Sequence, residues 1–299
     1  MAKTAFLFPG QGGQFVGQGQ KFLDKGPYLA DLWALAEEIS GLPIKKISLE
    51  GPAATLNDTL NLQPAILSLS LALAKILVSE GAEPIVAAGH SLGEYGALTL
   101  AGVITEKEAL TLVSLRAKLC QKAALDHPGA MAAILNIDSS EVEKLCELAL
   151  GVGTVVAANY NTPTQTVVSG EVKAVSALVR YAEMKKAKAL VLPVSGAFHS
   201  PLMSEAAREM AELLKEVDFK KPRFPVIPNA KGEPVDDPAL LKELLMEQMV
   251  SPVHWVKTSK AIKDFNPTEI VECWPKLFVG SLVKKCPPLD QNAIYRVPA

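Results

Sequence analysis

Apolar runs of strand length alternate with helix-like patterns through the first 125 residues of the chain. Two runs, residues 4–8 and 84–88, have the length of strands, and the segments between and after them are rich in Leu and Ala. Strands separated by helical segments are typical of βαβ units, whose strands pair in parallel. The pattern therefore predicts an α/β fold built on a parallel sheet.

The pattern changes near His127-Pro128-Gly129, where shorter elements begin. We expect strand, helix, strand, strand, helix and strand in that order, at 130–135, after Asp138, at 155–158, at 166–169, from Val172 and at 189–193. This order, βαββαβ, is that of a ferredoxin-like unit. It predicts an inserted small domain over residues 127–193, with residues 1–126 and 194–299 forming one large domain.

Local signals within this small domain are more detailed. Asp138 followed by Glu141 three residues later predicts a capping box at the start of the first helix. Helical spacing predicts that two sets of side chains face inward, namely Val142, Leu145, Leu148 and Ala149, and Val172, Val175, Leu178, Val179 and Ala182. The segment Asn-Tyr-Asn-Thr-Pro at 159–163 is expected to separate the two middle strands.

Composition and charge exclude several classes of function. A net charge of −2 over 299 residues gives no reason to expect nucleic acid or an anionic membrane as a partner. The four cysteines form no C-x-x-C pair, so neither a metal site nor a disulfide framework is indicated. The most apolar stretch, residues 62–78, falls short of the ~20 residues that cross a bilayer, so we expect a buried helix. No secretory signal is visible, and the chain is typical of a cytoplasmic protein.

The segment from Gly89 to Gly93 reads Gly-His-Ser-Leu-Gly, between a predicted strand and a predicted helix. The pattern G-x-S-x-G in this setting is typical of a sharp turn that exposes a nucleophilic serine, here Ser91. The N–H of Leu92 would then be placed to donate to an oxyanion. The alternative is a chance Gly/Ser turn, because the pentapeptide alone is common.

A serine nucleophile needs a general base. His90 adjoins Ser91 and would point away from it, His127 lies at the predicted domain junction, and His254 is flanked by apolar residues. His199 follows the predicted inserted domain and is the best candidate of the four, although any single histidine can be structural. Because no downstream acid stands out as its partner, a backbone carbonyl could orient its ring.

Arg116 falls in the apolar sector of a helix predicted over residues 105–122, which opens with a capping box at Thr105 and Glu108. A buried guanidinium must meet an anion. That anion could be an internal Asp or Glu, or it could be a substrate carboxylate held by two parallel hydrogen bonds. Periodicity alone does not favour either interpretation over the other. Gln248 likewise falls on the apolar stripe of a helix predicted over 238–249, where its amide needs structural or catalytic partners.

A glycine-rich segment, FPGQGGQFVGQGQ at residues 8–20, follows the first predicted strand. Its spacing fits neither G-x-G-x-x-G nor G-x-x-x-x-G-K-[ST], which excludes the nucleotide-binding interpretation. The segment is left as a turn whose small residues let the backbone at Gln11 approach another group.

In their order along the chain, these motifs resemble those of malonyl-CoA:acyl carrier protein transacylases, the discrete acyltransferases of fatty-acid synthesis. The resemblance is nearly end to end and rests on Phe8-Pro9-Gly10-Gln11-Gly12, Gly89-His90-Ser91-Leu92-Gly93, Arg116, Ala158-Asn159-Tyr160-Asn161, Phe198-His199-Ser200, Gln248 and Pro252-Val253-His254-Trp255. It implies an α/β-hydrolase-like core with an inserted ferredoxin-like domain, and ping-pong transfer of malonyl from malonyl-CoA to the phosphopantetheine thiol of acyl carrier protein.

The resemblance also implies a role for each matching residue. The roles are nucleophile for Ser91, general base for His199, oxyanion hole for the N–H groups of Gln11 and Leu92, clamp on the malonyl carboxylate for Arg116, substrate binding for Phe198, Asn159 and Asn161, and orientation of His199 for Gln248. It implies a cytoplasmic monomer without a metal or a cofactor, since coenzyme A thioester and phosphopantetheine are substrates. The alternatives are a malonyl loader acting in trans for a polyketide synthase, and a serine thioesterase or esterase.

Two segments depart from the family pattern. Ala197 stands where the discrete enzymes often carry Pro, and resembles malonyl-using polyketide acyltransferase domains. Glu272-Cys273-Trp274-Pro275-Lys276 replaces a segment that is usually Gly-Pro-Gly. Trp in place of a permissive Gly changes the backbone there and affects the surface near the substrate entrance or the carrier.

Overall fold

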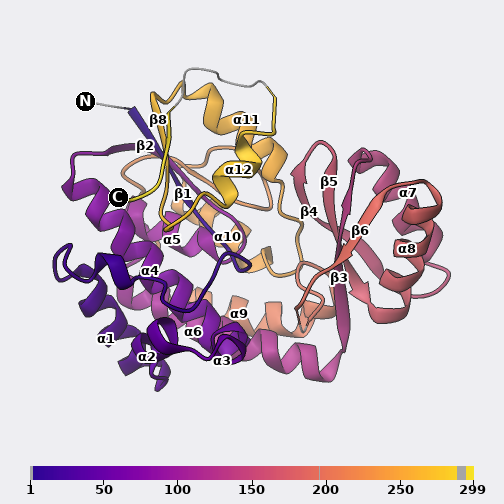
Figure 1. The fold of residues 1–299 in the computed structure, drawn as a ribbon, viewed down its shortest axis with the longest axis horizontal. Coiled ribbons are helices and arrows are strands. Elements are labelled where there is room, and N and C mark those ends of the chain that lie inside the picture. The colour runs from indigo at the N-terminus through magenta and orange to yellow at the C-terminus, as the bar shows by residue number, and fades with distance from the viewer. Residues whose placement is uncertain (1–2, 195, 288–293) are drawn as a thin grey trace.

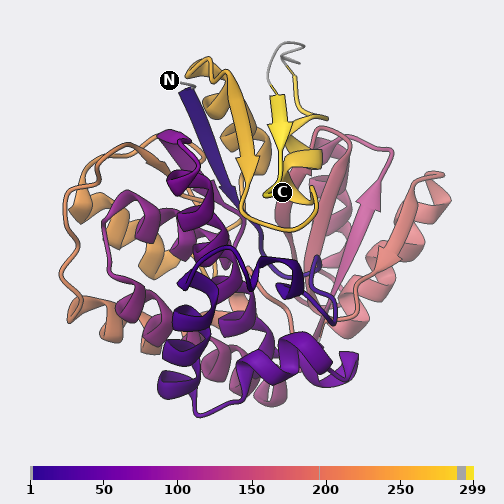
Figure 2. The same ribbon diagram turned by 60° about the vertical axis from the view of Figure 1, so that its left-hand side comes forward.

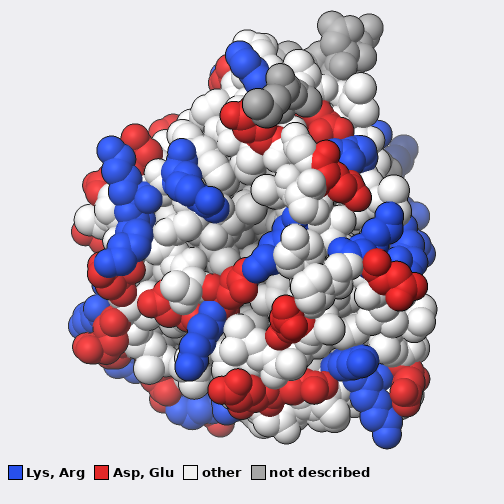
Figure 3. Space-filling view, turned by 90° about the vertical axis from the view of Figure 1, so that its left-hand side faces the viewer, with Lys and Arg blue, Asp and Glu red and all other residues white. Residues whose placement is uncertain are grey.

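The computed structural model describes residues 3–194, 196–287 and 294–299. A parallel sheet surrounded by helices lies beside a smaller antiparallel sheet, which carries its own two helices on its outer side (Figure 1). Acidic and basic side chains are intermingled over the face shown in Figure 3. The α/β class predicted from the sequence is confirmed.

The large sheet has five strands, and all of its pairings are parallel. Its order is β7 (Val226–Ile227), β2 (Glu83–Gly89), β1 (Lys3–Phe8), β8 (Glu269–Glu272) and β9 (Ile294–Arg296). The two strands predicted from apolar runs are β1 and β2, and they pair with each other.

Alternate residues of β1 face two different apolar clusters, as the two-residue period of a strand requires. Phe6 and Phe8 face the larger cluster, whereas Ala5 and Leu7 face the smaller one. The larger cluster is formed with α1 (Tyr28–Ser40), α2 (Ile44–Glu50), α3 (Ala53–Asn57), α4 (Thr59–Ser79), α5 (Gly93–Ala101), α6 (Glu106–Asp126), α9 (Ser204–Lys215) and α10 (Pro238–Glu247). The smaller is formed with α11 (Trp255–Asp264) and α12 (Val279–Val283).

The most apolar helix, α4, is longer than the sequence predicted. It has 21 residues, because it begins after the N-cap Asp58, whose side chain accepts a hydrogen bond from the N–H of Leu60. By length and composition α4 could cross a membrane, so the prediction that it is too short is wrong. However, 83% of its apolar window is buried within the protein, which confirms the prediction of a buried helix.

The small sheet has the predicted βαββαβ order. Its elements are β3 (Gly129–Leu135), α7 (Ser139–Ala149), β4 (Val155–Thr162), β5 (Gln165–Glu171), α8 (Val172–Met184) and β6 (Lys188–Val191). The strands pair in the order β4-β5-β3-β6, and all of these pairings are antiparallel. One apolar cluster fills the space between this sheet and its two helices.

Several local predictions for this region are wrong. Asp138 is the N-cap of α7, but its side chain makes no capping bond, and Glu141 instead pairs with Lys144 and Lys185. Leu148 is 64% exposed, since it lies more than a quarter turn from the centre of the buried stripe of α7. Val172, at the start of α8, is also exposed.

The segment 159–162 continues β4 rather than forming a turn. Its residues pair with β5 down to Gln165, with irregular register. It also connects the small sheet to the part of the chain built on the large sheet. The N–H of Tyr160 donates to the carbonyl of Val253 at 2.9 Å, and the N–H of Val253 donates to the carbonyl of Ala158 at 2.8 Å. The polar sequence of this segment conceals a strand with two partners.

Candidate active site

The carboxyl ends of four neighbouring strands lie at the same edge of the large sheet, which is where parallel sheets commonly bind ligands. The glycine-rich loop, residues 9–19, follows β1, and the serine turn follows β2. Asn229 follows β7, and residues 273–278, named here the β8 loop, follow β8. These four segments supply much of the site.

Ser91 occupies a strained turn between β2 and α5. Its φ is 52°, in the left-handed region that non-glycine residues rarely adopt. The flanking glycines are required, because a Cβ on Gly89 would lie 1.9 Å from the carbonyl carbon of Gly93, and one on Gly93 would lie 2.3 Å from the carbonyl oxygen of Phe8. The predicted strand–turn–helix setting of G-x-S-x-G is confirmed.

The ring of His199 lies against the side chain of Ser91. Its Nε2 is 2.7 Å from Ser91 Oγ, and its Nδ1 is 3.0 Å from the backbone carbonyl oxygens of both Gln248 and Ser251. Two carbonyl acceptors place the proton on Nδ1, so Nε2 carries a lone pair that can accept the hydroxyl proton. The sequence expectation that a carbonyl could orient this ring agrees with the geometry.

Burial lowers the pKa of His199 to about 3, with further lowering by the charges of Arg116 and His90. His199 is therefore neutral at physiological pH and available to accept a proton. Its φ of 57° is also in the left-handed region, so both members of the Ser–His pair have strained backbones.

The other histidines lie elsewhere. The Nε2 of His90 is 2.9 Å from Asn161 Oδ1, and the histidine on Ser91 Oγ is His199. His254 stacks on Tyr160, and His127 is exposed at the end of α6.

Arg116 extends from α6 toward Ser91 and is 4% exposed. Its Nη1 donates to Gln63 Oε1 at 2.8 Å, while Nη2 lies 3.2 Å from Ser91 Oγ and 3.4 Å from Gln248 Oε1. Its Nε has no hydrogen-bond partner in the described chain. None of the ion pairs formed by the described residues includes Arg116, so the geometry favours an external anion over an internal Asp or Glu.

A buried polar network beneath the turn was missed at the sequence level. Asn229 Oδ1 accepts from the N–H of Ser91 at 2.6 Å, and its Nδ2 donates to the carbonyl of Gly89 at 2.6 Å. Glu94 Oε2 accepts from the N–H of Asn229 at 3.0 Å and from Gln248 Nε2 at 2.9 Å. Gln248 Nε2 also donates to the carbonyl of Ser91 at 3.0 Å. The inward-facing Gln248 is thus a structural link between Ser91, Arg116 and Glu94.

Glu94 belongs to this network, and its carboxyl group is buried, with 1% of the residue exposed. Burial raises its pKa to about 7, and its hydrogen bonds with Gln248 and Asn229 and the charge of Arg116 oppose that rise. A signal for Glu94 was present, since it directly follows G-x-S-x-G on the helix that packs against the sheet. Asn229 follows a strand of two residues, too short to produce a periodic pattern.

The remaining predicted residues lie around this centre. Leu92 is the buried N-cap of α5, and Gln11 is partly exposed in the glycine-rich loop, which touches the serine turn. The contact is close, since a Cβ on Gly10 would lie 2.6 Å from the carbonyl oxygen of His90. Phe198 packs against two apolar clusters, one in each body. Asn159 is buried at the bridge to Val253.

The sequence and the fold match proteins of known activity. The family model described as acyl transferase domain matches residues 5–279. A malonyl CoA-acyl carrier protein transacylase of Bacillus subtilis is 38% identical over 95% of this chain and 90% of that protein, and one of Escherichia coli K12 is 35% identical over 95% and 93%. The chain belongs to this transacylase family.

A solved structure within the family gives the same result for the fold. The acyl-carrier-protein S-malonyltransferase of Burkholderia pseudomallei superposes with a TM-score of 0.92 at 38% identity, covering 99% of this chain and 96% of that one. The predicted family and the predicted class of enzyme, an acyltransferase, are therefore confirmed.

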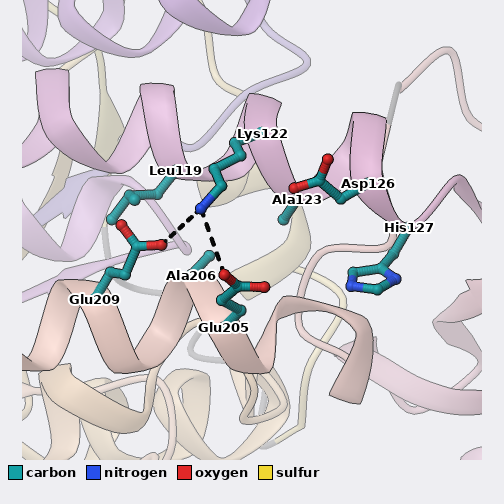
Figure 4. A pocket seen from close by; sticks show the side chains of 8 residues that line it. All are labelled: Leu119, Lys122, Ala123, Asp126, His127, Glu205, Ala206 and Glu209. Atoms are coloured by element: carbon teal, nitrogen blue, oxygen red, sulfur yellow. Dashed lines mark hydrogen bonds and ion pairs between the residues drawn. The ribbon is translucent and has the colours of Figure 1, made fainter.

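A pocket lies between α6 and α9 and shares no residue with the Ser–His centre. In it Lys122 contacts Glu209 at 2.9 Å and Glu205 at 3.4 Å (Figure 4). These charges are about half exposed, and such pairs contribute little stability.

The described residues hold no group of three or more His, Cys, Asp or Glu side chains arranged to bind a metal ion.

Proposed function

We propose that the chain transfers malonyl from malonyl-CoA to the phosphopantetheine thiol of an acyl carrier protein, through a malonyl ester of Ser91, and so supplies fatty-acid synthesis. The observation that carries the proposal is the buried Arg116 guanidinium 3.2 Å from Ser91 Oγ, with no carboxylate partner among the described residues. A hydrolase of neutral esters has no use for a cation there.

In the first half-reaction, His199 Nε2 removes the hydroxyl proton as Ser91 Oγ attacks the thioester carbonyl. The tetrahedral oxyanion accepts hydrogen bonds from the backbone N–H groups of Gln11 and Leu92. When the intermediate collapses, the C–S bond breaks and His199 returns its proton to the coenzyme A sulfur. In the second half-reaction His199 deprotonates the carrier thiol, whose sulfur attacks the carbonyl of malonyl-Ser91. The C–O bond of the ester then breaks, and His199 returns the proton to Ser91 Oγ.

Selectivity for malonyl rests on Arg116. A carboxylate can accept two parallel N–H bonds from a guanidinium, whereas acetyl would leave that charge unpaired. Gln248 contacts both Arg116 and His199: its side chain accepts a hydrogen bond from Arg116, and its backbone carbonyl orients the His199 ring. We assign Phe198, Asn159 and Asn161 to the wall that encloses the acyl group.

The same proposal extends to the architecture. The large body, residues 1–126 and 194–299, would be an α/β-hydrolase-like domain, and residues 127–193 a ferredoxin-like insertion. The strand order β4-β5-β3-β6 and the separate apolar cluster of the small sheet support this division. We further propose a cytoplasmic monomer that needs no metal or cofactor and binds neither nucleic acid nor membrane.

A polyketide pathway is a second candidate for the destination of the malonyl group. One structural relative, at 32% identity and a TM-score of 0.93, is a malonyl-transacylase in complex with the carrier protein of a type II polyketide synthase. Transfer by this chain to carrier proteins of each pathway, compared at equal concentration, would separate the two destinations.

Intact-mass spectrometry tests the acyl-enzyme directly. After mixing with malonyl-CoA, the protein should gain one malonyl group, which Ser91→Ala abolishes. Adding a holo acyl carrier protein should discharge the group to its thiol, whereas water should remove it slowly. Rapid loss to water without a preference for the thiol would identify a thioesterase or esterase instead.

A further inference from the structure

The β8 loop and the glycine-rich loop leave the large sheet side by side. Leu7 of β1 is opposite Glu272 of β8, and the N–H of Cys273 donates to the carbonyl of Leu7 at 2.8 Å. Figure 2 shows β1 and β8 adjacent and pointing the same way. The segment that departs from the family pattern therefore begins beside the loop that carries Gln11.

Three side chains of the β8 loop contact the glycine-rich loop. Trp274 is 1% exposed, and its indole N–H donates to the carbonyl of Gly13 at 3.1 Å. The ring of Phe278 packs so closely that a Cβ on Gly12 would lie 3.1 Å from it. The ammonium group of Lys276 lies 4.5 Å from the centre of the Phe15 ring, a cation–π contact.

The β8 loop is itself firmly anchored. The carboxylate of Glu272, which is fully buried, accepts hydrogen bonds from the N–H groups of Phe278 at 2.7 Å, Val279 at 3.0 Å and Gly280 at 2.9 Å. Three such bonds fix both ends of the loop relative to β8. Trp274 is thus held on a rigid support.

The glycine-rich loop needs such a support. Gly12, Gly17 and Gly19 all have φ between 89° and 116°, and glycine loses more conformational freedom on folding than any other residue. Oxyanion-hole donors act by being aimed before the reaction, because they then need no reorganisation when charge develops. A mobile backbone at Gln11 would lose that advantage.

We infer that Trp274 is a positioning residue, which holds the carbonyl of Gly13 and thereby aims the N–H of Gln11, two residues earlier, at the oxyanion, and that Lys276, on the Phe15 ring, is a weaker second hold on the same loop. The inference rests on the proposed function, and in particular on the role of Gln11. The Gly-Pro-Gly segment that is usual at this position in the family has no side chain that could donate this hydrogen bond. In this chain the indole of Trp274 donates it.

Trp274→Phe tests the inference, because it keeps an aromatic ring and removes the indole N–H. Single-turnover acylation of Ser91 by malonyl-CoA should slow by roughly 10- to 100-fold, part of the ~10²–10³ lost when a whole oxyanion donor is removed. Binding of malonyl-CoA, measured in a Ser91→Ala background with and without the Trp274 change, should be unaltered. This split between rate and affinity is not expected of a general loss of packing.

Trp33→Phe is the control for packing on the same loop, since Trp33 is equally buried, its ring packs against Gly19 at the far end of the glycine-rich loop, and its indole N–H has no partner in the described chain. It should leave the acylation rate unchanged. Lys276→Met, an exposed change that keeps the fold, should slow acylation by roughly two- to five-fold.

Acylation of Trp274→Phe at the wild-type rate, or a loss no larger than that of Trp33→Phe, would overturn the inference and leave the proposed function intact. If Trp274→Phe does not fold, an undiminished rate in Lys276→Met overturns it. Wild-type protein that is never malonylated would refute the proposed function itself.

Discussion

Replacing Arg116 by Ala should separate malonyl transfer from acetyl transfer. The guanidinium is 4% exposed and makes three hydrogen bonds, all to uncharged acceptors, so its charge is available for a carboxylate. Removing one partner of a buried ion pair costs about 3–5 kcal/mol. At ~1.4 kcal/mol for each factor of ten, kcat/KM for malonyl-CoA should fall roughly 10²- to 10⁴-fold.

The assay measures Ser91 acylation and carrier loading with malonyl-CoA and acetyl-CoA in parallel. Arg116→Ala should spare or raise the acetyl rate, since acetyl never pairs with the guanidinium. Arg116→Lys should recover only part of the malonyl rate, because an ammonium group cannot form the bidentate pair. Lys118→Ala, on the exposed face of the same helix, should change neither rate. Equal losses for both acyl groups would refute the reasoning and make Arg116 structural.

Three further predictions concern the serine turn and its base. Because the pKa of His199 is lowered to about 3, kcat/KM for acylation should stay flat from pH 7 down to about pH 5, whereas a decline with a midpoint near 6.5 would contradict that environment. Gly93→Ala should destabilise the fold by about 1–3 kcal/mol and abolish acylation, because the added Cβ clashes with the backbone of Phe8. Gly151→Ala, where a Cβ would meet open space, should change neither stability nor acylation. Thermal unfolding measures the stability of both variants, and an acylation assay measures their activity. Asn229→Ala removes the side-chain partners of the buried Gly89 carbonyl and the partly buried Ser91 N–H, and should lower stability by roughly 2–5 kcal/mol in urea unfolding. An unchanged midpoint would show that water replaces the amide.

The pH dependence of stability follows from the shifted pKa values of His199 and Glu94. The pKa of His199 is depressed in the folded state, so the unfolded chain binds the extra proton and stability falls as the pH drops below about 6.5. The pKa of Glu94 is raised to about 7, so the unfolded chain loses its proton first and stability falls as the pH rises from about 4.5 to 7. Burial raises the pKa of Glu272 to about 7 as well, so Glu94→Gln should reduce the second dependence without removing it and should leave the first, as urea unfolding at several pH values can measure.

Residues set by local pattern could be predicted from the sequence. Ser91 follows from two glycines between a strand and a helix, and Arg116 from its place on an apolar helical face. The capping box at Thr105 and Glu108 forms as predicted. In each case the physical constraint acts within one turn or one helix, so neighbouring residues carry the signal.

Residues set by tertiary contacts could not be predicted in the same way. Asn229 meets Ser91 only because β7 pairs with β2, and neither residue indicates the other. His199 was only the best of four histidines, since its two carbonyl partners come from a segment about 50 residues away in the chain. The strand over 159–162 was missed because its polar side chains hide pairing by backbone atoms.

The bridge between β4 and Val253 has a consequence for chimeric proteins. It joins the small sheet to the segment whose carbonyls orient His199 through two backbone hydrogen bonds, beside the stack of Tyr160 on His254. Apart from Asn159, Tyr160 and Asn161, side chains of the small sheet can therefore diverge, provided that the length and register of β4 are kept. Small sheets exchanged between relatives at residues 127 and 193 should yield active hybrids, whereas a single-residue deletion in β4 should inactivate the enzyme while leaving every catalytic side chain in place.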